Sequence, residues 1–548
     1  MLADFLLLDF RNQGWHTFDL THPAMNVPFH CRIIAALAIV LAIAGSQRLG
    51  ADSSEQRTPA ETFVLNQVRS GAEADLDKSH LPNHLLRAEF LQKLITGEFK
   101  TPQTEHHGIK ISHAVVKDKL VLASETISPE VWLKSSNFEG GVDFEYARFS
   151  RDLSLEGSIF GKPGAAPSAT SSGSTGQDSQ CDHAEAAMGS SSSAGDAIFL
   201  GMKVEGTLNF NCAVFYVPLN LSYADVAGEF LFKNVNYESE ENADFENFKV
   251  KEPALFTNDH FAGKIIFADA QLFELIIIHP RNEIDLDLTQ AHIEQVFSIQ
   301  NATLSSLRAP SLIVSGDATF ENVVPAGRVY LGHSHFQDLT IGDFDEWLKA
   351  AARPLPAHSL DRCSVDLEGL SFEDVTIPNT EVKPQAKRLL ELIKGSQCPF
   401  SPQPYMELEK FLSAHGYPQE ADEVFIAMHE SERKQLDPWK RPFDCVLDVI
   451  VGYGRKTWRA VIGAIALIIL GTFLFRASYM EPEDKSTDLW YNPFWYSLDL
   501  FSPIDLGMAK KWRPTKLYPE VRGYGQVHRL LGWILIPLIV AAITGIIK

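Results

Sequence analysis

Hydrophobic side chains recur at every eleventh position through the middle of this chain, and this repeat restricts the possible folds more than any other feature. The series begins at Ile109, runs unbroken to Phe160, and resumes at Ala197. Each unit reads apolar-x-apolar, then four residues, then one apolar anchor. The repeat predicts a shared interior formed by Leu120, Leu122, Ile127, Val131, Leu133, Phe138, Val142, Phe144, Phe149, Leu153, Leu155, Phe160, Leu208, Phe210, Phe215, Leu219, Leu221 and Val226.

This unit predicts a short strand followed by a turn. An apolar-x-apolar pair puts two side chains on one face of a strand, whereas the columns skip the i+3 and i+4 positions that a helix needs. Short strands that contact only their neighbours stack into a solenoid, most simply a right-handed parallel β-helix. Two units per coil give about nine coils and a stack of roughly 43 Å at ~4.8 Å per strand. Leucine-rich repeats are the alternative, but their fixed Asn or Cys and their longer period are missing.

The ends of a β-helix are open strand edges that need covering, so we expect helical caps. Helical spacing around residues 86–95 and over 387–392 and 405–433 supplies them. Residues 161–196 are rich in Gly, Ser, Ala and Thr, which predicts a flexible insertion. The predicted fold is mainly β, with five segments: a signal peptide or N-terminal anchor at 1–51, a linker and helical cap at 52–107, the solenoid at 108–379, a helical cap and juxtamembrane region at 380–457, and a two-span membrane hairpin at 458–548.

Both ends of the chain carry apolar segments. Residues 33–44 have the length of a signal-peptide core, with a small-x-small site at its end, and an uncleaved anchor is the alternative. Two uncharged runs near the C-terminus predict transmembrane helices, one from Ala460 to Phe475 and one from Leu530 to Ile547. Basic residues precede both runs, so the positive-inside rule gives conflicting orientations. A cleaved signal would place the solenoid outside the cytoplasm.

Composition excludes several classes of protein. The chain has 48 Lys and Arg against 70 Asp and Glu, a formal net charge of −22, which argues against nucleic acid as a partner. A mean hydropathy of −0.06 excludes a polytopic transporter but permits two or three spans. Six cysteines without a C-x-x-C pair argue against a zinc ribbon, an iron–sulfur cluster or a thioredoxin-like site. In an exported domain, Cys181 can pair with Cys212 and Cys363 with Cys398.

An aromatic segment between the two spans is the strongest candidate for a functional element in the membrane region. It is expected to lie in the interface as an amphipathic helix or to re-enter the bilayer. Its marked residues are Asn492, Tyr496, Asp499, Pro503 and Asp505. Gly-Tyr-Gly occurs at 452–454 and at 523–525, but neither copy has the pore-helix context and electrostatics of a potassium filter.

Candidate chemistry in the solenoid is sparse. His333 and His335 would share a strand face and are weak metal candidates without an evident third ligand, so turn histidines are the favoured interpretation. Asp285 and Asp287 resemble the outward carboxylates of β-helix hydrolases and lyases. The simpler interpretation is that both are acidic side chains exposed to solvent without a catalytic role. No phosphate loop, dinucleotide motif or nucleophile motif occurs with suitable flanks. We therefore assign no catalytic residue and no cofactor.

Several ordered motifs give a family resemblance. The repeat columns, with echoes such as Ala224-Asp225-Val226, resemble bacterial pentapeptide-repeat proteins, although a strict five-residue period is absent. The chain is similar over residues 82–160 and 400–548 to bacterial membrane proteins with a β-helix and a two-span tail, often labelled membrane-associated oxidoreductase. The C-terminal motifs are Tyr405-Met406-Glu407-Leu408-Glu409, Val451-Gly452-Tyr453-Gly454, Asn492-Pro493, Pro503-Ile504-Asp505-Leu506-Gly507 and Leu531-Gly532-Trp533.

Three functions remain as hypotheses. The first is a scaffold or binding protein that presents an acidic solenoid at the bacterial inner membrane, on the periplasmic side, to a protein or polysaccharide partner. The second is a channel or sensor built on the C-terminal hairpin. The third is an enzyme, including the oxidoreductase activity that the resemblance implies.

Overall fold

The computed structural model describes residues 57–99, 106–162, 181, 195–353, 363–378, 380–396, 400–456, 458–483 and 490–544. Residues 59–548 form one unit, and the account below concerns it. The predicted signal peptide or anchor at 1–51 lies outside the described residues, as does most of the predicted insertion at 161–196.

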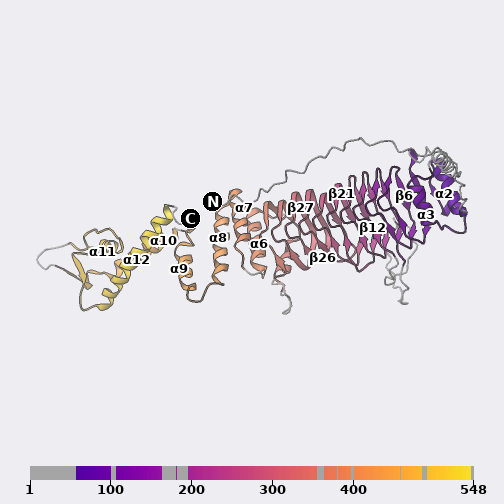
Figure 1. Cartoon of the computed structure of the whole chain (residues 1–548). Coiled ribbons are helices and arrows are strands. Elements are labelled where there is room, and N and C mark those ends of the chain that lie inside the picture. The colour runs from indigo at the N-terminus through magenta and orange to yellow at the C-terminus, as the bar shows by residue number, and fades with distance from the viewer. Residues whose placement is uncertain are drawn as a thin grey trace, which may run out of the picture. The chain divides into compact units, whose positions relative to one another are not determined.

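The repeat forms a parallel β-solenoid of about nine turns (Figure 1), so the predicted fold class is confirmed at this level. Stacked strands lie 22 residues apart, as in the register Ile109↔Val131↔Leu153, and each coil therefore contains two eleven-residue units. Across the insertion, Leu153 pairs with Leu208 in the same column, so the stacking continues unbroken.

Each early coil contains four short strands, and strands at the same position in successive coils stack into a column. Three of the four columns belong to the large sheet, and the other is a separate six-stranded sheet. The first column contains β1 (Ala74–Asp75), β2 (Ile109–Ser112), β6 (Val131–Lys134), β10 (Leu153–Ser154), β14 (Leu208–Asn209) and β18 (Phe230–Lys233). The second contains β4 (Leu120–Val121), β8 (Val142–Asp143), β12 (Ala197–Ile198), β16 (Leu219–Asn220), β20 (Ala243–Asp244), β23 (Ile265–Ile266), β25 (Ile284–Asp287) and β29 (Val365–Asp366). The third contains β5 (Thr126–Ile127), β9 (Arg148–Phe149), β13 (Lys203–Val204) and β17 (Asp225–Val226).

The fourth column is the six-stranded sheet, and it ends at β22. Its strands are β3 (Val115–Val116), β7 (Asn137–Phe138), β11 (Ile159–Phe160), β15 (Val214–Phe215), β19 (Asn236–Tyr237) and β22 (His260–Phe261). In later coils, long strands run from one column into the next, namely β21 (Lys249–Thr257), β24 (Gln271–Ile278), β26 (His292–Arg308), β27 (Ile313–Tyr330), β28 (His335–Ile341) and β30 (Ser371–Thr376). This change explains why the sequence repeat loosens after residue 272.

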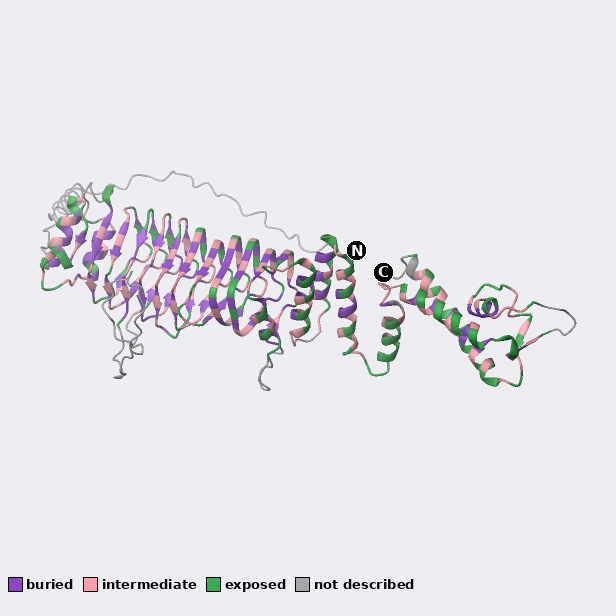
Figure 2. Ribbon diagram, turned by 180° about the vertical axis from the view of Figure 1, so that it is seen from behind, coloured by how far each residue is buried: buried purple, intermediate pink, exposed green. Residues whose placement is uncertain are grey.

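The interior of the solenoid is apolar and rich in aromatic rings. Each of the eighteen predicted interior side chains is at most 1% exposed. Phe160 lies between Phe138 and Phe215, with ring centroids 5.5 Å and 4.6 Å away and nearly parallel planes. The colouring by burial in Figure 2 shows purple running along the strands of the solenoid. Stacked rings of this kind contribute packing energy beyond the area that they bury.

One residue at each of several corners of the coils has a positive φ, in the left-handed region, and these residues recur at a regular interval. His113, Ser124, Ser135 and Tyr146 have φ values of 61°, 62°, 46° and 54°, and the series continues at nearly the same interval beyond the insertion. Asn and Asp tolerate this conformation better than most residues. At one corner the Asn258 amide donates to Asn234 Oδ1 at 2.6 Å, so the corners also stack by hydrogen bonds between coils.

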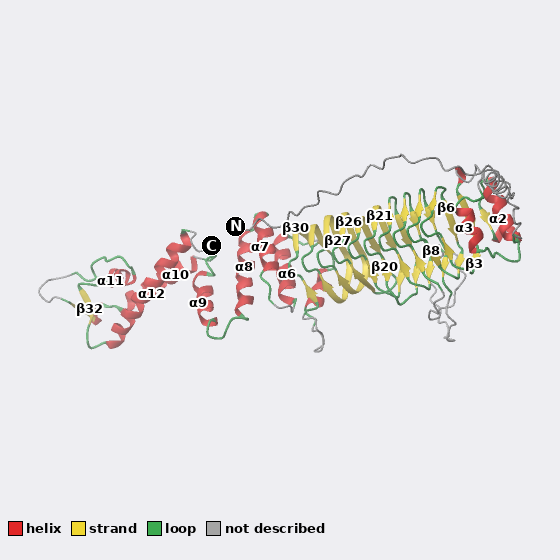
Figure 3. Ribbon diagram, viewed as in Figure 1, coloured by secondary structure: helices red, strands yellow, loops and turns green. Residues whose placement is uncertain are grey.

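Helices lie at both ends of the solenoid (Figure 3). At the N-terminal end, α2 (Pro59–Ser70) and α3 (Ala88–Ile95) are joined by Arg87, whose Nε lies 2.7 Å from the buried Glu61 Oε1. After the solenoid come α6 (Val382–Gly395), α7 (Gln403–Ala414) and α8 (Pro418–Arg433), while α5 (Phe344–Ala351) interrupts the last coils. These helices contribute Leu389, Leu392 and Leu408 to the core cluster of the solenoid.

The C-terminal part is helical, with α9 (Arg441–Val451), α10 (Trp458–Leu474), α11 (Pro493–Phe501) and α12 (Pro519–Ile543), and with a small hairpin of β31 (Met480–Pro482) and β32 (Trp512–Pro514). Two 3-10 turns, η1 (Asp77–Ser79) and η2 (Ala477–Tyr479), complete the described elements. Residues 519–541 of α12 are long and apolar enough to cross a membrane, whereas α10 is apolar but shorter. Gly523-Tyr524-Gly525 lies within helix α12, which agrees with the sequence argument against a potassium filter there.

Candidate functional site

The two histidines named as weak metal candidates occupy different kinds of position. His333 is a corner residue with φ 58°, and its ring lies against Gly369. His335 is on β28, where Nδ1 is 3.0 Å from Ser371 Oγ. Within the described residues there is no group of three or more His, Cys, Asp or Glu side chains that could hold a metal ion.

Cysteines connect parts of the solenoid covalently. Cys181, from the insertion, forms a disulfide with the corner residue Cys212, as the sequence allowed. Cys363 is also disulfide-bonded, while its predicted partner Cys398 lies outside the described residues. Cys445 is a free, exposed thiol. Disulfides of this kind persist in oxidising compartments.

A side face of the late solenoid carries a shallow hollow of about 620 Å³. Leu286, Leu307, Val329 and Val365 stack in register and are buried, so the residues on either side of each point outward. The outward positions form two ladders. One ladder is Asp285, Ser306 and Arg328, and the other is Asp287, Arg308, Tyr330 and Asp366.

Two cations that line this hollow lie near Asp287, which stands beside it. Lys264 Nζ lies 2.8 Å from Asp287 Oδ2, and Arg308 Nε lies 3.7 Å from the same oxygen. Arg328 stacks over the Tyr330 ring, with its guanidinium carbon 5.5 Å from the ring centroid. Acids, cations and an aromatic ring from successive coils therefore converge on one open surface.

The two neighbouring carboxyl groups differ in acidity. Burial raises the pKa of Asp285, and the attraction of Lys264 and a hydrogen bond from Ser306 only partly oppose this effect. Burial acts on Asp287 as well, but hydrogen bonds from Lys264 and Thr289 outweigh it and lower the pKa of that group. Asp285 Oδ1 is buried, and no described residue donates a hydrogen bond to it. Separated acidities and an unpaired buried oxygen are features of functional sites.

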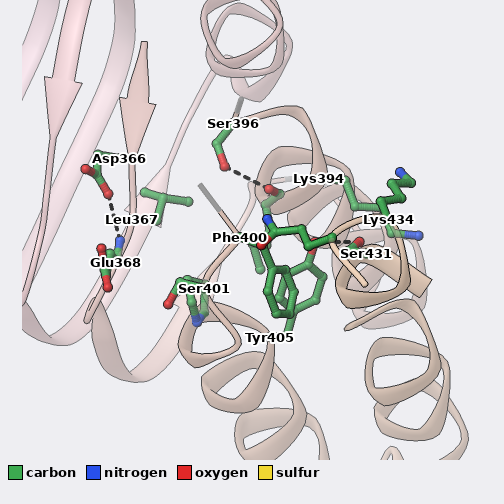
Figure 4. Close-up of a pocket in the computed structure, with 13 residues that line it drawn as sticks. Asp366, Leu367, Glu368, Lys394, Ser396, Phe400, Ser401, Tyr405, Ser431 and Lys434 are labelled. Atoms are coloured by element: carbon green, nitrogen blue, oxygen red, sulfur yellow. Dashed lines mark hydrogen bonds between the residues drawn. The ribbon is translucent and has the colours of Figure 1, made fainter. Parts of the chain in front are cut away.

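A second cleft lies where the last coil meets the helices that follow it (Figure 4). It has a volume of about 220 Å³. Asp366 and Glu368 line it from the solenoid side, and Lys394, Tyr405 and Lys434 line it from the helices. Tyr405 donates to Ser431 Oγ at 3.1 Å, which fixes the ring between α7 and α8. Asp366 borders both this cleft and the side-face hollow.

The aromatic segment between the apolar helices is the short helix α11, and its marked residues shape it. Asn492 caps the N-terminus by accepting hydrogen bonds from the backbone of Phe494 and Trp495. Asp499 is only 5% exposed and accepts the N–H groups of Leu506 and Ala509, each at 2.6 Å. The remaining marked residues are Tyr496, which is buried, Pro503, which lies in the bend after the helix, and Asp505, which pairs with Lys510.

Helices α10, α11 and α12 pack around buried polar groups that the sequence analysis missed. Ser497 and His528 are fully buried, and Ser497 Oγ lies 3.2 Å from His528 Nε2. Ser497 also donates to the Ile468 carbonyl at 2.9 Å, and Tyr524 OH lies 3.3 Å from His528 Nδ1. Gly471 of α10 allows α11 to approach α10 closely, because a Cβ at position 471 would lie 2.2 Å from Ser497 Oγ. The available signal was His528, a titratable residue two positions before the apolar run that begins at Leu530.

The ends of the predicted spans occupy different environments. Ala460 and Phe475 are buried within the helical unit, whereas Leu530 is 61% exposed. Ile547 lies outside the described residues.

Arg433 connects α8 to α9 through charged groups that are distant in sequence. Its guanidinium contacts Asp444 and, at 2.7 Å, Asp448, and it also donates to the Tyr453 hydroxyl. Hydrogen bonds to the two carboxylates and to Tyr453 raise the pKa of Arg433, so this group stays charged. Gly452, whose φ is 52°, ends α9 and places Tyr453 in this cluster.

A buried acid in the solenoid gives a pH-dependent prediction. Burial raises the pKa of Asp259 well above its ordinary value, although Val235 N–H donates to it at 2.8 Å. A folded-state pKa above the unfolded value means that stability is lost as the pH rises through the folded-state pKa. We expect Asp259→Asn, which keeps an acceptor for Val235, to raise the free energy of unfolding at pH 8 by about 1–2 kcal/mol and to flatten this pH dependence. Denaturant unfolding at pH 5 and pH 8 measures both effects, and exposed Asp118→Asn is the control.

No protein-family model matches this chain. The curated proteins and the solved structures likewise give no match.

Proposed function

We propose that this protein is a β-solenoid binding or scaffolding protein that its C-terminal helices attach to a membrane. The observation that carries the proposal is the distribution of exposed apolar side chains. Among the described residues between 57 and 438, the exposed large hydrophobic side chains are few: Val121, Tyr146, Tyr223, Ile313, Val324 and Met406. In the C-terminal part they are dense, and α10 and α12 carry many of them, including Ile462, Ile465, Phe473, Leu530, Trp533 and Ile534.

Helix α9 supports membrane attachment independently. Its apolar side chains Phe443, Val446 and Val449 are 72%, 52% and 66% exposed, whereas Asp444 and Asp448 face Arg433 of α8. An amphipathic helix with an uncovered apolar face is typical of a segment lying in the membrane interface. Because α9 directly precedes the apolar α10, the two would enter the same bilayer.

The proposed location is the bacterial inner membrane, with the solenoid on the periplasmic side. The disulfide between Cys181 and Cys212 supports an exported solenoid, because such bonds are rare in the cytosol. The bacterial source is proposed from the sequence resemblance alone. The proposed partner is a protein or a polysaccharide, which the long side faces of a solenoid can contact over several coils.

The membrane contact of α9 can be tested by substitution. We expect Phe443→Ser combined with Val449→Ser to release part of the protein from lipid vesicles in a flotation gradient, because two exposed apolar side chains would no longer be buried in lipid. The matched control is Met406→Ser in α7, which is 56% exposed but belongs to the solenoid cap. Equal flotation of the double variant and the control would contradict the role of α9.

A pore is the second candidate, and the placement of α11 favours it. A short helix and a loop lie between two apolar helices, and Asp499 holds the loop against the short helix. Ile504 and Leu506 of that loop are 69% and 48% exposed, so copies of the chain could line a passage there. Ion conductance across vesicles that contain the purified protein tests this candidate. Oxidoreductase activity stays a prediction from the resemblance alone.

A further inference from the structure

The segment around α9 is cationic in an otherwise acidic chain. Residues 433–459 contain seven Lys and Arg against three Asp, whereas the whole chain has a formal net charge of −22. All three acids are paired within the segment: the two on α9 contact Arg433, and Asp437 Oδ2 lies 3.0 Å from Lys440 Nζ. The positive charge of this segment therefore exceeds what its own acids neutralise.

Four of these cations keep their charge uncompensated after every ion pair is counted. Arg455 pairs with one acid of α7 and one of α8. Arg441 donates to the backbone carbonyls of Lys434 and Leu436, at 2.9 Å and 3.0 Å, and a carbonyl does not cancel its charge. Within the described part of the chain, no carboxylate forms an ion pair with Lys434, Arg441, Lys456 or Arg459.

An exposed tryptophan accompanies the unpaired cations at each end of α9. Before the helix, Trp439 is 67% exposed and stands two residues from Arg441. After it, Trp458 is 59% exposed and lies between Lys456 and Arg459 in sequence. Tryptophan is enriched where a membrane meets water. The exposed apolar face of α9 joins these two ends, over about 16 Å for a helix of 11 residues.

This pattern selects the kind of partner. A small anion such as phosphate would contact one end of α9 and leave the apolar face in water. An anionic bilayer presents headgroup phosphates at both ends of the helix and acyl chains along the face between them.

We propose that α9 and the residues on either side of it bind an anionic phospholipid surface. Arg441 at one end and Lys456 and Arg459 at the other contact headgroup phosphates, and the apolar face lies among the first acyl carbons. Basic residues next to an anionic bilayer are attracted to it, and salt weakens this attraction. The inference rests on the proposed membrane attachment and names the class of lipid that the attachment prefers.

The test follows the contact of α9 with the bilayer through Cys445, the exposed free thiol of that helix. Full-length protein is reconstituted into vesicles of phosphatidylcholine, with or without phosphatidylglycerol, and treated with an uncharged maleimide. Mass spectrometry of the peptide that contains Cys445 gives the rate of modification. We expect this rate to be about fivefold lower in the anionic vesicles, because the headgroups hold α9 against the bilayer, and high salt to remove most of the difference. Lys456→Gln combined with Arg459→Gln is expected to bring the two rates within about twofold of each other.

The matched control removes two exposed cations of the solenoid, Lys117→Gln with Lys203→Gln, and should keep the full difference between the two kinds of vesicle. Circular dichroism and gel filtration establish that both double variants are folded. The inference is overturned by equal rates for the wild type in the two kinds of vesicle. An undiminished difference in the Lys456 and Arg459 variant, or an equal loss in the control, would overturn it as well.

Flotation of the same preparations separates this inference from the proposed function. Flotation with phosphatidylcholine vesicles, together with equal rates at Cys445, would reject the preference for anionic lipid and leave membrane attachment standing. Failure to float with either kind of vesicle would reject the proposed function itself.

Discussion

Replacing Phe160 by alanine is expected to lower the free energy of unfolding of the solenoid by about 3–5 kcal/mol. The ring is fully buried and stacks on Phe138 and Phe215, so its removal opens a cavity between coils on either side of the insertion. Because each coil of a solenoid contacts only its neighbours, a weak interface there also divides the stack into two parts. Denaturant unfolding followed by circular dichroism measures the loss and shows whether a second transition appears.

The control is Val121→Ala, in the same solenoid, where the side chain is 39% exposed. Its expected cost is about 0.5 kcal/mol or less. Equal effects of the two substitutions would mean that Phe160 does not lie in a continuous packed interior.

Gly532→Leu is expected to disrupt the C-terminal helical unit. A Cβ at Gly532 would lie 1.9 Å from the backbone oxygen of Phe501, so α11 has to move away from α12. Overpacking costs about 1–3 kcal/mol even where side chains can adjust, and a backbone carbonyl adjusts least. The measurement is gel filtration in detergent after heating to a series of temperatures. We expect the single peak of the folded protein to disappear at a lower temperature for the variant than for the wild type.

The same helix provides the control for this experiment. A Cβ at Gly523 meets no atom within 4 Å, so Gly523→Leu should keep the wild-type profile. Identical behaviour of the two leucine variants would contradict the close packing of α11 against α12.

The fold of the solenoid could be predicted because its signal is repeated. A column such as Leu120, Val142 and Ala197 needs only side chains of one kind at a fixed interval. The later coils were harder to predict because the fourth column ends at β22 and strands then run around the corners. The corner conformation was missed because residues as different as Tyr146 and Asn258 adopt it.

The candidate sites were less predictable, because they depend on contacts between distant residues. Asp285 and Asp287 are visible as a pair in the sequence, but Arg308 and Arg328 join them only through the register of neighbouring coils. Arg433 similarly meets Asp448 across the turn between two helices. Likewise, nothing near Ser497 in sequence indicates that His528 lies beside it.

The most direct test of the central proposal is extraction of the unmodified full-length protein from membranes. The exposed apolar surfaces of α10 and α12 predict that the protein stays in the membrane pellet after alkaline carbonate treatment and floats with lipid in a density gradient. Release into the supernatant by carbonate, together with sedimentation away from the lipid, would contradict attachment by these helices.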